Sequence, residues 1–294
     1  MLLINLIHFI LDLAALALWI NWRTYPQNAQ RLAPPATLVG TLRRADPPLA
    51  RRWHYLAGLG TLLVARVFLY RFIASAVFWT GILNAGVVSV VFRVEDLSQM
   101  FLYSLLSFGV VLWIFHLWML LLSLVNPGVP EAAPFQHFAR QHLGAVNNWP
   151  VLLKLILPLV GSTLLWWLIS WPLTHWGFLP TRFTAMHRLE QALVIGVASY
   201  FVWKYLIAAV LLLHLVNSYV YFGNHGFWHY VNGVARLLLR PMAKIPMRVG
   251  KVDFAPVVAL VLVFFLSHVA VDGLPLSKNY KIPGLVDIYA RLPF

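Results

Sequence analysis

Hydrophobic residues run along the chain in long segments that are separated by polar, proline-containing intervals. We place the segments at about 2–21, 55–80, 99–125, 151–173, 191–216 and 254–271. Each is near the roughly 20 residues that an α-helix needs to cross the hydrocarbon core of a bilayer. Backbone groups in lipid must pair internally, and no alternating strand pattern recurs, so helices are favoured over a β-barrel. The pattern therefore predicts an all-α integral membrane protein with about six transmembrane helices.

One apolar stretch fits none of these helices. Residues 77–92 read "VFWTGILNAGVVSVVF" and contain two glycines. The stretch could continue the second helix, lie along the outer membrane interface, or form a contact surface for another protein. The sequence does not choose among these placements.

Composition supports the membrane interpretation and excludes several kinds of chemistry. Of the 294 residues, 61% are hydrophobic and 11% are charged. A soluble domain of this size cannot bury that much apolar surface. The absence of cysteine excludes disulfides, thiolate metal sites, iron–sulfur clusters and cysteine nucleophiles.

The net charge of +13 raises the possibility of nucleic-acid binding, but the basic residues gather where the loops on one side of a membrane protein would lie. More than half of the 22 Lys and Arg residues fall in 22–52, 127–149 and 223–252, which lie on one side of a six-helix chain. The positive-inside rule makes that side cytoplasmic and both termini external. We therefore expect a multi-pass protein of the bacterial inner membrane, with anionic lipid headgroups rather than nucleic acid as partners. Because arginines follow the first apolar run and none precede it, we expect an anchor there and not a cleaved signal peptide.

An internal repeat is visible when the chain is compared with itself. The third helix ends "LLLSLVNPG" (120–128) and the fifth ends "LLLHLVNSY" (211–219). "FQHF" and "FWHY" follow at similar distances, and the next helices open "NNWPVLL" (147–153) and "DFAPVVA" (253–259). The first hairpin lacks the Phe-x-His pair and is more diverged. The interpretation is three helical hairpins, at 1–98, 99–180 and 181–294, each joined by a cytoplasmic amphipathic segment.

The joining segment of the third hairpin has the pattern of an interfacial helix. In 227–240, apolar residues share one side at helical spacing, while Arg236 and Arg240 fall on another. We expect this helix to lie parallel to the membrane, with both arginines and Lys244 contacting headgroups or an anionic partner, and 134–144 to lie at a similar depth. Pro241 should end the helix. Asp253 is a plausible N-cap for the final helix.

At these residues the chain resembles the YggT family of small bacterial and plastid membrane proteins. That family's second helix follows a basic, proline-containing stretch and begins Asp-x-x-Pro. "LLLRPMAKIPMRVGKVDFAPVVALVL" (237–262) matches this signature, and weaker echoes cover 99–170 and 1–80. The chain departs from the family in having three hairpins instead of one or two, and in having Asn147 as the second cap. The resemblance implies a role in membrane-complex biogenesis, cofactor maturation or envelope organisation, without defined chemistry. The residues that match are Arg240, Pro241, Pro246, Gly250, Asp253 and Pro256.

Two opposite charges are expected inside the membrane at matching depth. Asp12 lies ten residues into the first helix, with His8 one turn away on the same face, and Arg66 lies in the antiparallel second helix. Because an ionised side chain in hydrocarbon is costly, we expect Asp12 and Arg66 to form an intramembrane ion pair. The alternative is a proton or ion relay, which would need further acidic groups.

Histidines supply the other candidate chemistry. His116 and His214 lie in the first helices of the second and third repeats, where imidazole could ligate heme iron or a chlorophyll-type magnesium. The alternative is interhelical hydrogen bonding. No confident cofactor follows from this pattern, and no metal site is expected. The chain has no Gly-rich phosphate loop, nucleophile elbow or HExxH motif, so it is not expected to be an enzyme.

Three functions remain open on this reading. The favoured one is a non-catalytic membrane scaffold, an accessory or assembly subunit that packs against a larger membrane complex. A small ion transporter or channel would use Asp12, Arg66 and Lys204, although the sequence shows no helix clearly broken at the midplane. A heme- or pigment-binding subunit would use His116 or His214.

Overall fold

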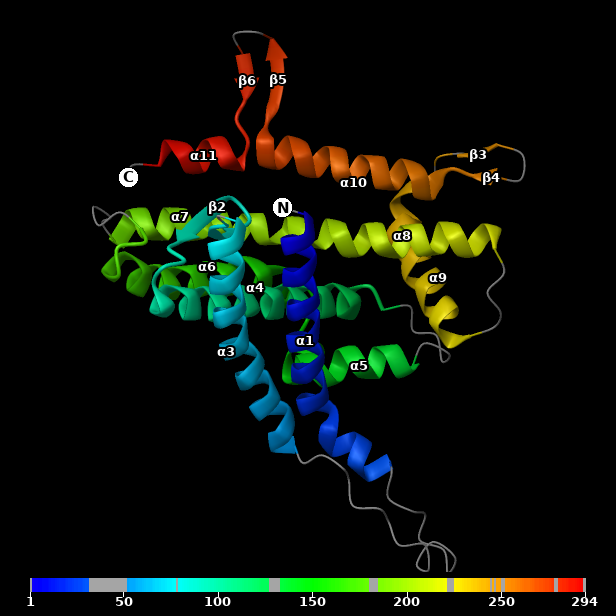
Figure 1. Ribbon diagram of the computed structural model, residues 1–294. Helices are drawn as coiled ribbons and strands as arrows, with labels where there is room; N and C mark the ends of the chain where they lie inside the picture. Colours follow the sequence, from blue (N-terminus) through cyan, green and yellow to red (C-terminus); the bar gives the residue numbers. More distant parts are fainter. Residues whose placement is uncertain are drawn as a thin grey trace, which may run out of the picture. The chain divides into compact units, whose positions relative to one another are not determined.

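The computed structural model describes residues 2–31, 52–77, 79–126, 133–179, 185–220, 225–243, 245, 247–249, 252–277 and 280–292. Over these residues the chain is mainly helical (Figure 1). Six helices within the described ranges are long and apolar enough to cross a membrane. The prediction of an all-α, multi-pass membrane protein is thereby confirmed. These spans are Ile4–Thr24, Arg52–Ala74, Leu97–Leu124, Val151–His175, Ala185–Tyr219 and Ala255–Asp272.

The described chain divides into two compact units. The first comprises Met1–Leu83 with Val91–Trp113, and the second comprises Asn84–Val90 with Ile114–Phe294. The division passes through α4 (Leu97–Leu124), so this helix contributes to both units. The three-hairpin division expected from the repeat stays a prediction.

In the first unit, α1 (Leu2–Arg31) and α3 (Arg52–Val77) pack along each other and against the first half of α4. Ala15, Leu59 and Phe108 form the buried centre of this packing, one from each helix. Gly58 of α3 lies beside Leu18 of α1, and a Cβ there would meet the Leu18 side chain at an ordinary contact distance of 3.6 Å. The three helices are therefore held together by small and large apolar side chains at the same level.

The segment that the sequence could not place forms a two-stranded sheet after α3. β1 (Gly81–Ala85) and β2 (Val88–Phe92) are joined by a turn in which Gly86 has a φ of +73°. Along β2, Val88, Val90 and Phe92 are buried while the residues between them are exposed. Two-residue alternation of this kind is the mark of a half-buried strand. A continuation of the second helix is therefore wrong for residues 81–92, while a placement along the outer interface or against another protein stays a prediction.

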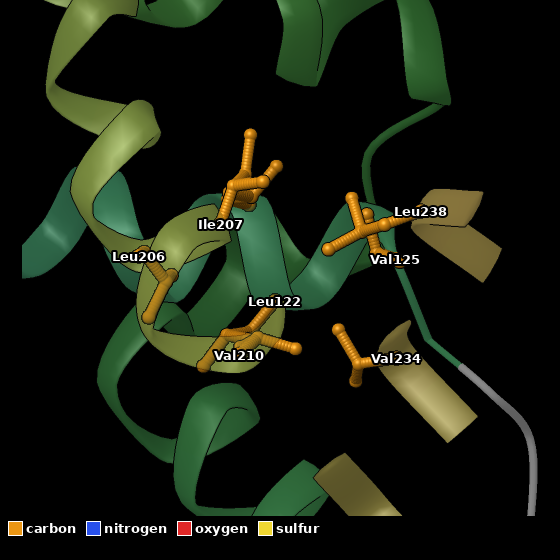
Figure 2. A pocket seen from close by; sticks show the side chains of 8 residues that line it. Leu122, Val125, Leu206, Ile207, Val210, Val234 and Leu238 are labelled. Atoms are coloured by element: carbon orange, nitrogen blue, oxygen red, sulfur yellow. The ribbon is translucent and has the colours of Figure 1, made fainter. Parts of the chain in front are cut away.

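In the second unit, α6 (Val151–His175) packs closely on α7 (Ala185–Ala198), while α8 (Trp203–Tyr219) packs on α9 (Gly226–Leu239) and α10 (Ala255–Asp272). An apolar hollow lies where α4, α8 and α9 meet. Figure 2 shows side chains from the three helices converging on it, with Val125, just after the end of α4, beside Leu238 of α9. The labelled residues are Leu122, Val125, Leu206, Ile207, Val210, Val234 and Leu238.

Helix α9 is amphipathic as expected, but protein covers much of its apolar face. Val231, Val234 and Ala235 are buried in a core with α8 and α10. Arg236 and Arg240 are exposed on the other side. The helix ends at Leu239, and Pro241 follows in the short 3₁₀ segment η4 (Arg240–Met242). Its position relative to a bilayer stays a prediction.

Helix α5 (Ala133–Leu143) makes different contacts from α9, although the predicted repeat would make the two segments equivalent. Phe135 stacks on Tyr230 of α9, with ring centroids 5.3 Å apart. Phe138 and His142 then contact Phe115, which lies nine residues before the end of α4, roughly 13 Å along the helix axis. The helix therefore extends back along α4 from its end.

The start of α10 carries the best-matched part of the family signature. Asp253, in β4 (Val252–Asp253), accepts a hydrogen bond through Oδ1 from the Ala255 amide at 3.0 Å. Phe254 holds the N-cap position itself, and Pro256 is buried in the first turn. The carboxylate thus satisfies one of the free amides at the helix start. β4 pairs with β3 (Arg248–Val249), whereas Lys244, Pro246 and Gly250 lie outside the described residues.

A third strand pair, absent from the sequence expectations, follows α10. β5 (Leu274–Ser277) pairs antiparallel with β6 (Tyr280–Ile282), and α11 (Leu285–Arg291) completes the described chain. Gly273 starts the hairpin with a φ of +80°, and a Cβ there would lie 2.3 Å from the Ile282 carbonyl oxygen. Only glycine fits this close approach.

Candidate functional site: a buried charge network

The ion pair expected from the sequence is present in the first unit. Asp12 of α1 and Arg66 of α3 face each other, with Arg66 Nη1 2.8 Å from Asp12 Oδ1. The Arg66 residue is 0% exposed and Asp12 is also buried. Each charge would be very costly alone in a membrane-spanning segment, and pairing with good geometry offsets that cost.

The rest of the guanidinium is also hydrogen-bonded within this unit. Arg66 Nε and Nη2 donate to the Tyr70 hydroxyl at 3.1 and 3.0 Å, and Nη2 lies 3.3 Å from Ser107 Oγ. Tyr70 is one turn further along α3, and Ser107 comes from α4. A single arginine therefore ties together three membrane-spanning helices.

The distances around His8 define its protonation. His8 Nδ1 lies 3.4 Å from Arg66 Nη2, whose two hydrogens are already directed to Tyr70 and Ser107, so the contact with Tyr70 decides the role of Nδ1. The Tyr70 oxygen already accepts from Arg66, and its own hydrogen points to His8 Nδ1 at 2.6 Å. The imidazole hydrogen is then on Nε2, which lies 3.2 Å from Asp12 Oδ2 and 3.3 Å from Ser107 Oγ. We assign His8 as neutral and as a donor to the carboxylate.

Aromatic rings pack beside this network. Tyr103 stacks against His8 with ring centroids 6.0 Å apart, and it meets Tyr70 edge-on at 5.7 Å. Trp79 lies against both tyrosines, and Phe92 lies against Tyr103. These rings help to shield the charges from water, which strengthens every electrostatic interaction inside.

The arrangement allows two kinds of behaviour. Tyr70, His8 and Asp12 form a hydrogen-bonded row along which a proton could shift. The row closes on Arg66, which contacts both of its ends, at Tyr70 and at Asp12. A closed ring of contacts fixes helix positions, whereas a relay needs an opening at each end. Sequence reasoning missed Tyr70 and Ser107; the four-residue spacing of Tyr70 from Arg66 was the available signal.

The histidines proposed as cofactor ligands lie in the second unit. His214 Nδ1 is 2.7 Å from Asn232 Oδ1 of α9, an interhelical hydrogen bond that leaves Nε2 as the nitrogen able to ligate a metal. His116 of α4 contacts the neighbouring Phe115 ring. Among the described residues, no group of three or more His, Cys, Asp or Glu side chains is placed to hold a metal ion.

A further polar feature of the second unit was not expected from the sequence. The span Ala185–Tyr219 changes from α-helix to a 3₁₀ segment, η3 (Ser199–Val202), between α7 and α8. Ser199 Oγ donates to the carbonyls of Gly196 and Pro158 at 2.7 and 3.2 Å. Mid-helix 3₁₀ stretches often mark hinges. The sequence signal for this interruption was Pro158 within α6, which lies opposite a glycine of α7.

Two tryptophans fix this interruption against α4. Trp203 Nε1 donates to the Leu117 carbonyl at 2.9 Å, and Trp118 Nε1 donates to the Val202 carbonyl at 3.2 Å. The exchange is reciprocal, with each helix giving one indole and one carbonyl. Lys204 follows at once, with Nζ 5.1 Å from the ring centroid of Tyr205.

No protein-family model, curated protein or solved structure matches the chain. The resemblance to the YggT family therefore rests on the sequence signature alone.

Proposed function

We propose that the protein is a non-catalytic membrane scaffold, an accessory or assembly subunit that packs against a larger membrane complex. The observation that carries this proposal is the closed network around Arg66. Its guanidinium contacts Asp12, Tyr70 and Ser107 inside one unit, so its charge is used to hold helices together.

The outer faces of the terminal helices give independent support. Only 17% of the span in α1 and 17% of the span in α10 is buried by the rest of the chain. Both helices therefore offer long apolar faces to lipid or to another membrane protein. The YggT-like signature at 237–262 agrees with an assembly role. We place the protein in the bacterial inner membrane with both termini outside, on the basis of the basic intervals.

The test combines particle mass with ion flux. A scaffold extracted in mild detergent should migrate in a particle of fixed composition well above its own 33.4 kDa. Loss of the chain should lower the amount of that particle. The purified protein in liposomes should pass no more protons than empty liposomes under a pH gradient. A proton flux that Asp12→Asn abolishes would refute the proposal.

A small transporter is the second candidate, and the 3₁₀ segment Ser199–Val202 is the observation that favours it. Interrupted helices in the membrane expose backbone groups that can bind ions, and Lys204 adjoins this interruption. The same liposomes decide this case. Transport that responds to Ser199→Ala and Lys204→Met, with Lys154→Met as the matched control, would favour this candidate over the scaffold.

A further inference from the structure

A pocket of about 710 Å³ opens in the first unit, beyond the buried charge network. Its described lining includes Arg71 and Ala74 of α3, Trp79 after that helix, and the stretch Val91–Glu95 that leads to α4. Binding pockets for small molecules commonly measure about 300–1,000 Å³. The volume is therefore sufficient for a headgroup and its glycerol.

The pocket lies where two membrane spans end. Arg71 is three residues before the end of the span Arg52–Ala74, and Glu95 is two residues before the start of Leu97–Leu124. Guanidinium and indole groups at such a boundary meet phospholipid headgroups. This places the pocket at the depth of lipid phosphates.

The chemistry of the lining is that of a site for an anionic amphiphile. Arg71 and Arg93 are exposed and present two guanidinium groups, while Glu95 adds one carboxylate, which leaves one net positive charge. The ion pairs observed among the described residues include neither arginine. Ala74 and Phe92 are buried and supply an apolar floor. Guanidinium groups bind phosphate oxygens in bidentate fashion.

We infer that this pocket binds the headgroup of a membrane phospholipid with a single net negative charge, such as a phosphodiester without an ammonium group. The two arginines contact the phosphate, and Trp79 and the apolar floor contact the glycerol and the first acyl carbons. The wall of the site adjoins the charge network, because the Trp79 ring lies 5.2 Å from Tyr70. The inference does not depend on the proposed scaffold function.

The chain has no cysteine, so one label can be introduced at a chosen place. Ile82→Cys, exposed on β1 and outside the pocket lining, carries an environment-sensitive fluorophore on the full chain in non-ionic detergent. The label is titrated with dioctanoyl phosphatidylglycerol. Two further titrations use dioctanoyl phosphatidylcholine, with the same chains and no net charge, and glycerophosphoglycerol, with the headgroup and no chains. Melting temperature with each ligand is a second readout.

We expect saturable binding of phosphatidylglycerol, with Arg71→Gln/Arg93→Gln weakening it about thirtyfold and Arg93→Gln alone about fivefold. The matched control for the single variant is Arg291→Gln, which removes one exposed charge from α11 and should change the affinity less than twofold. Equal affinity for phosphatidylcholine, or no loss in the pocket variants, would overturn the inference. Equal affinity for the chain-free headgroup would assign the pocket to a soluble anion and overturn its assignment to lipid.

Discussion

Arg66 and Lys154 are both buried cations in membrane-spanning helices, yet their hydrogen-bond and ion-pair partners differ. Arg66, 0% exposed within α3, is paired with a carboxylate and with the hydroxyls of Tyr70 and Ser107. Lys154, 7% exposed, donates to one neutral group, Ser123 Oγ at 2.9 Å. Lys154 is the fourth residue of α6, close to the helix start, whereas Arg66 lies more than three turns from either end of α3. An ammonium near a helix end can reach headgroups, but a mid-helix guanidinium must be neutralised by protein.

The largest expected effect is on Arg66. Arg66→Leu leaves the Asp12 carboxylate buried without its counter-ion, and we expect a loss of about 3–5 kcal/mol in the free energy of unfolding. Asp12→Leu/Arg66→Leu removes both charges and should cost clearly less. Denaturant titration in detergent micelles measures both variants. If the double variant is as unstable as Arg66→Leu, the carboxylate was not the reason for the loss.

The hydroxyl of Tyr70 gives the next largest effect. Tyr70→Phe removes the acceptor of two guanidinium hydrogen bonds and the donor to His8, at an expected cost of about 1–3 kcal/mol. Tyr103→Phe is the matched control. Its ring packs in the same cluster, and no hydrogen bond of its hydroxyl is observed among the described residues. We expect that control to change stability by less than about 0.5 kcal/mol. Similar losses for both variants would show that ring packing dominates.

Substitution of Lys154 should lower the free energy of unfolding less than substitution of Arg66. Lys154→Met keeps the length of the side chain and removes the charge, and we expect a change within about 1 kcal/mol. Ser123→Ala, which removes its acceptor, should behave similarly. Unfolding titrations under the conditions used for Arg66→Leu provide the measurement. A loss comparable to that of Arg66→Leu would mean that position along the helix does not decide whether a buried cation needs a counter-ion from the protein.

An ion pair outside the candidate membrane spans should contribute least to stability. Lys281 Nζ lies 2.6 Å from Asp287 Oδ2, and this hydrogen bond lowers the pKa of the Asp287 carboxyl, helped by the Gly284 amide. Because the pKa is lower in the folded state, the contribution is complete above the ordinary value of 3.8 and is lost as pH falls below it. The protection of the α11 amides from hydrogen exchange, measured against their intrinsic rate at each pH, should therefore fall at acid pH. In Asp287→Asn, the exchange should already be faster at neutral pH and should lose most of this pH response.

The membrane spans and the Asp12–Arg66 pair follow from the sequence by itself. Length and hydrophobicity identify a span, because lipid forces the backbone to pair within the segment. Depth along two antiparallel helices brings Asp12 and Arg66 to one level, and the cost of an unpaired charge makes their contact expected. The stop at Pro241 and the role of Asp253 at the start of α10 are local effects of the same kind.

Tertiary structure decided which faces of the helices contact one another, and therefore which side chains come together. Ser107 joins the Arg66 network from more than forty residues away, and no local pattern specifies that rotation of α4. The segments α5 and α9, which the predicted repeat would pair, contact different surfaces, because the helices available beside each one differ. The strands β1 and β2 form from an apolar run that could as well have been helix, and they place Phe92 and Arg93 at the pocket. Periodicity within one segment selects its form, but packing between segments selects its neighbours.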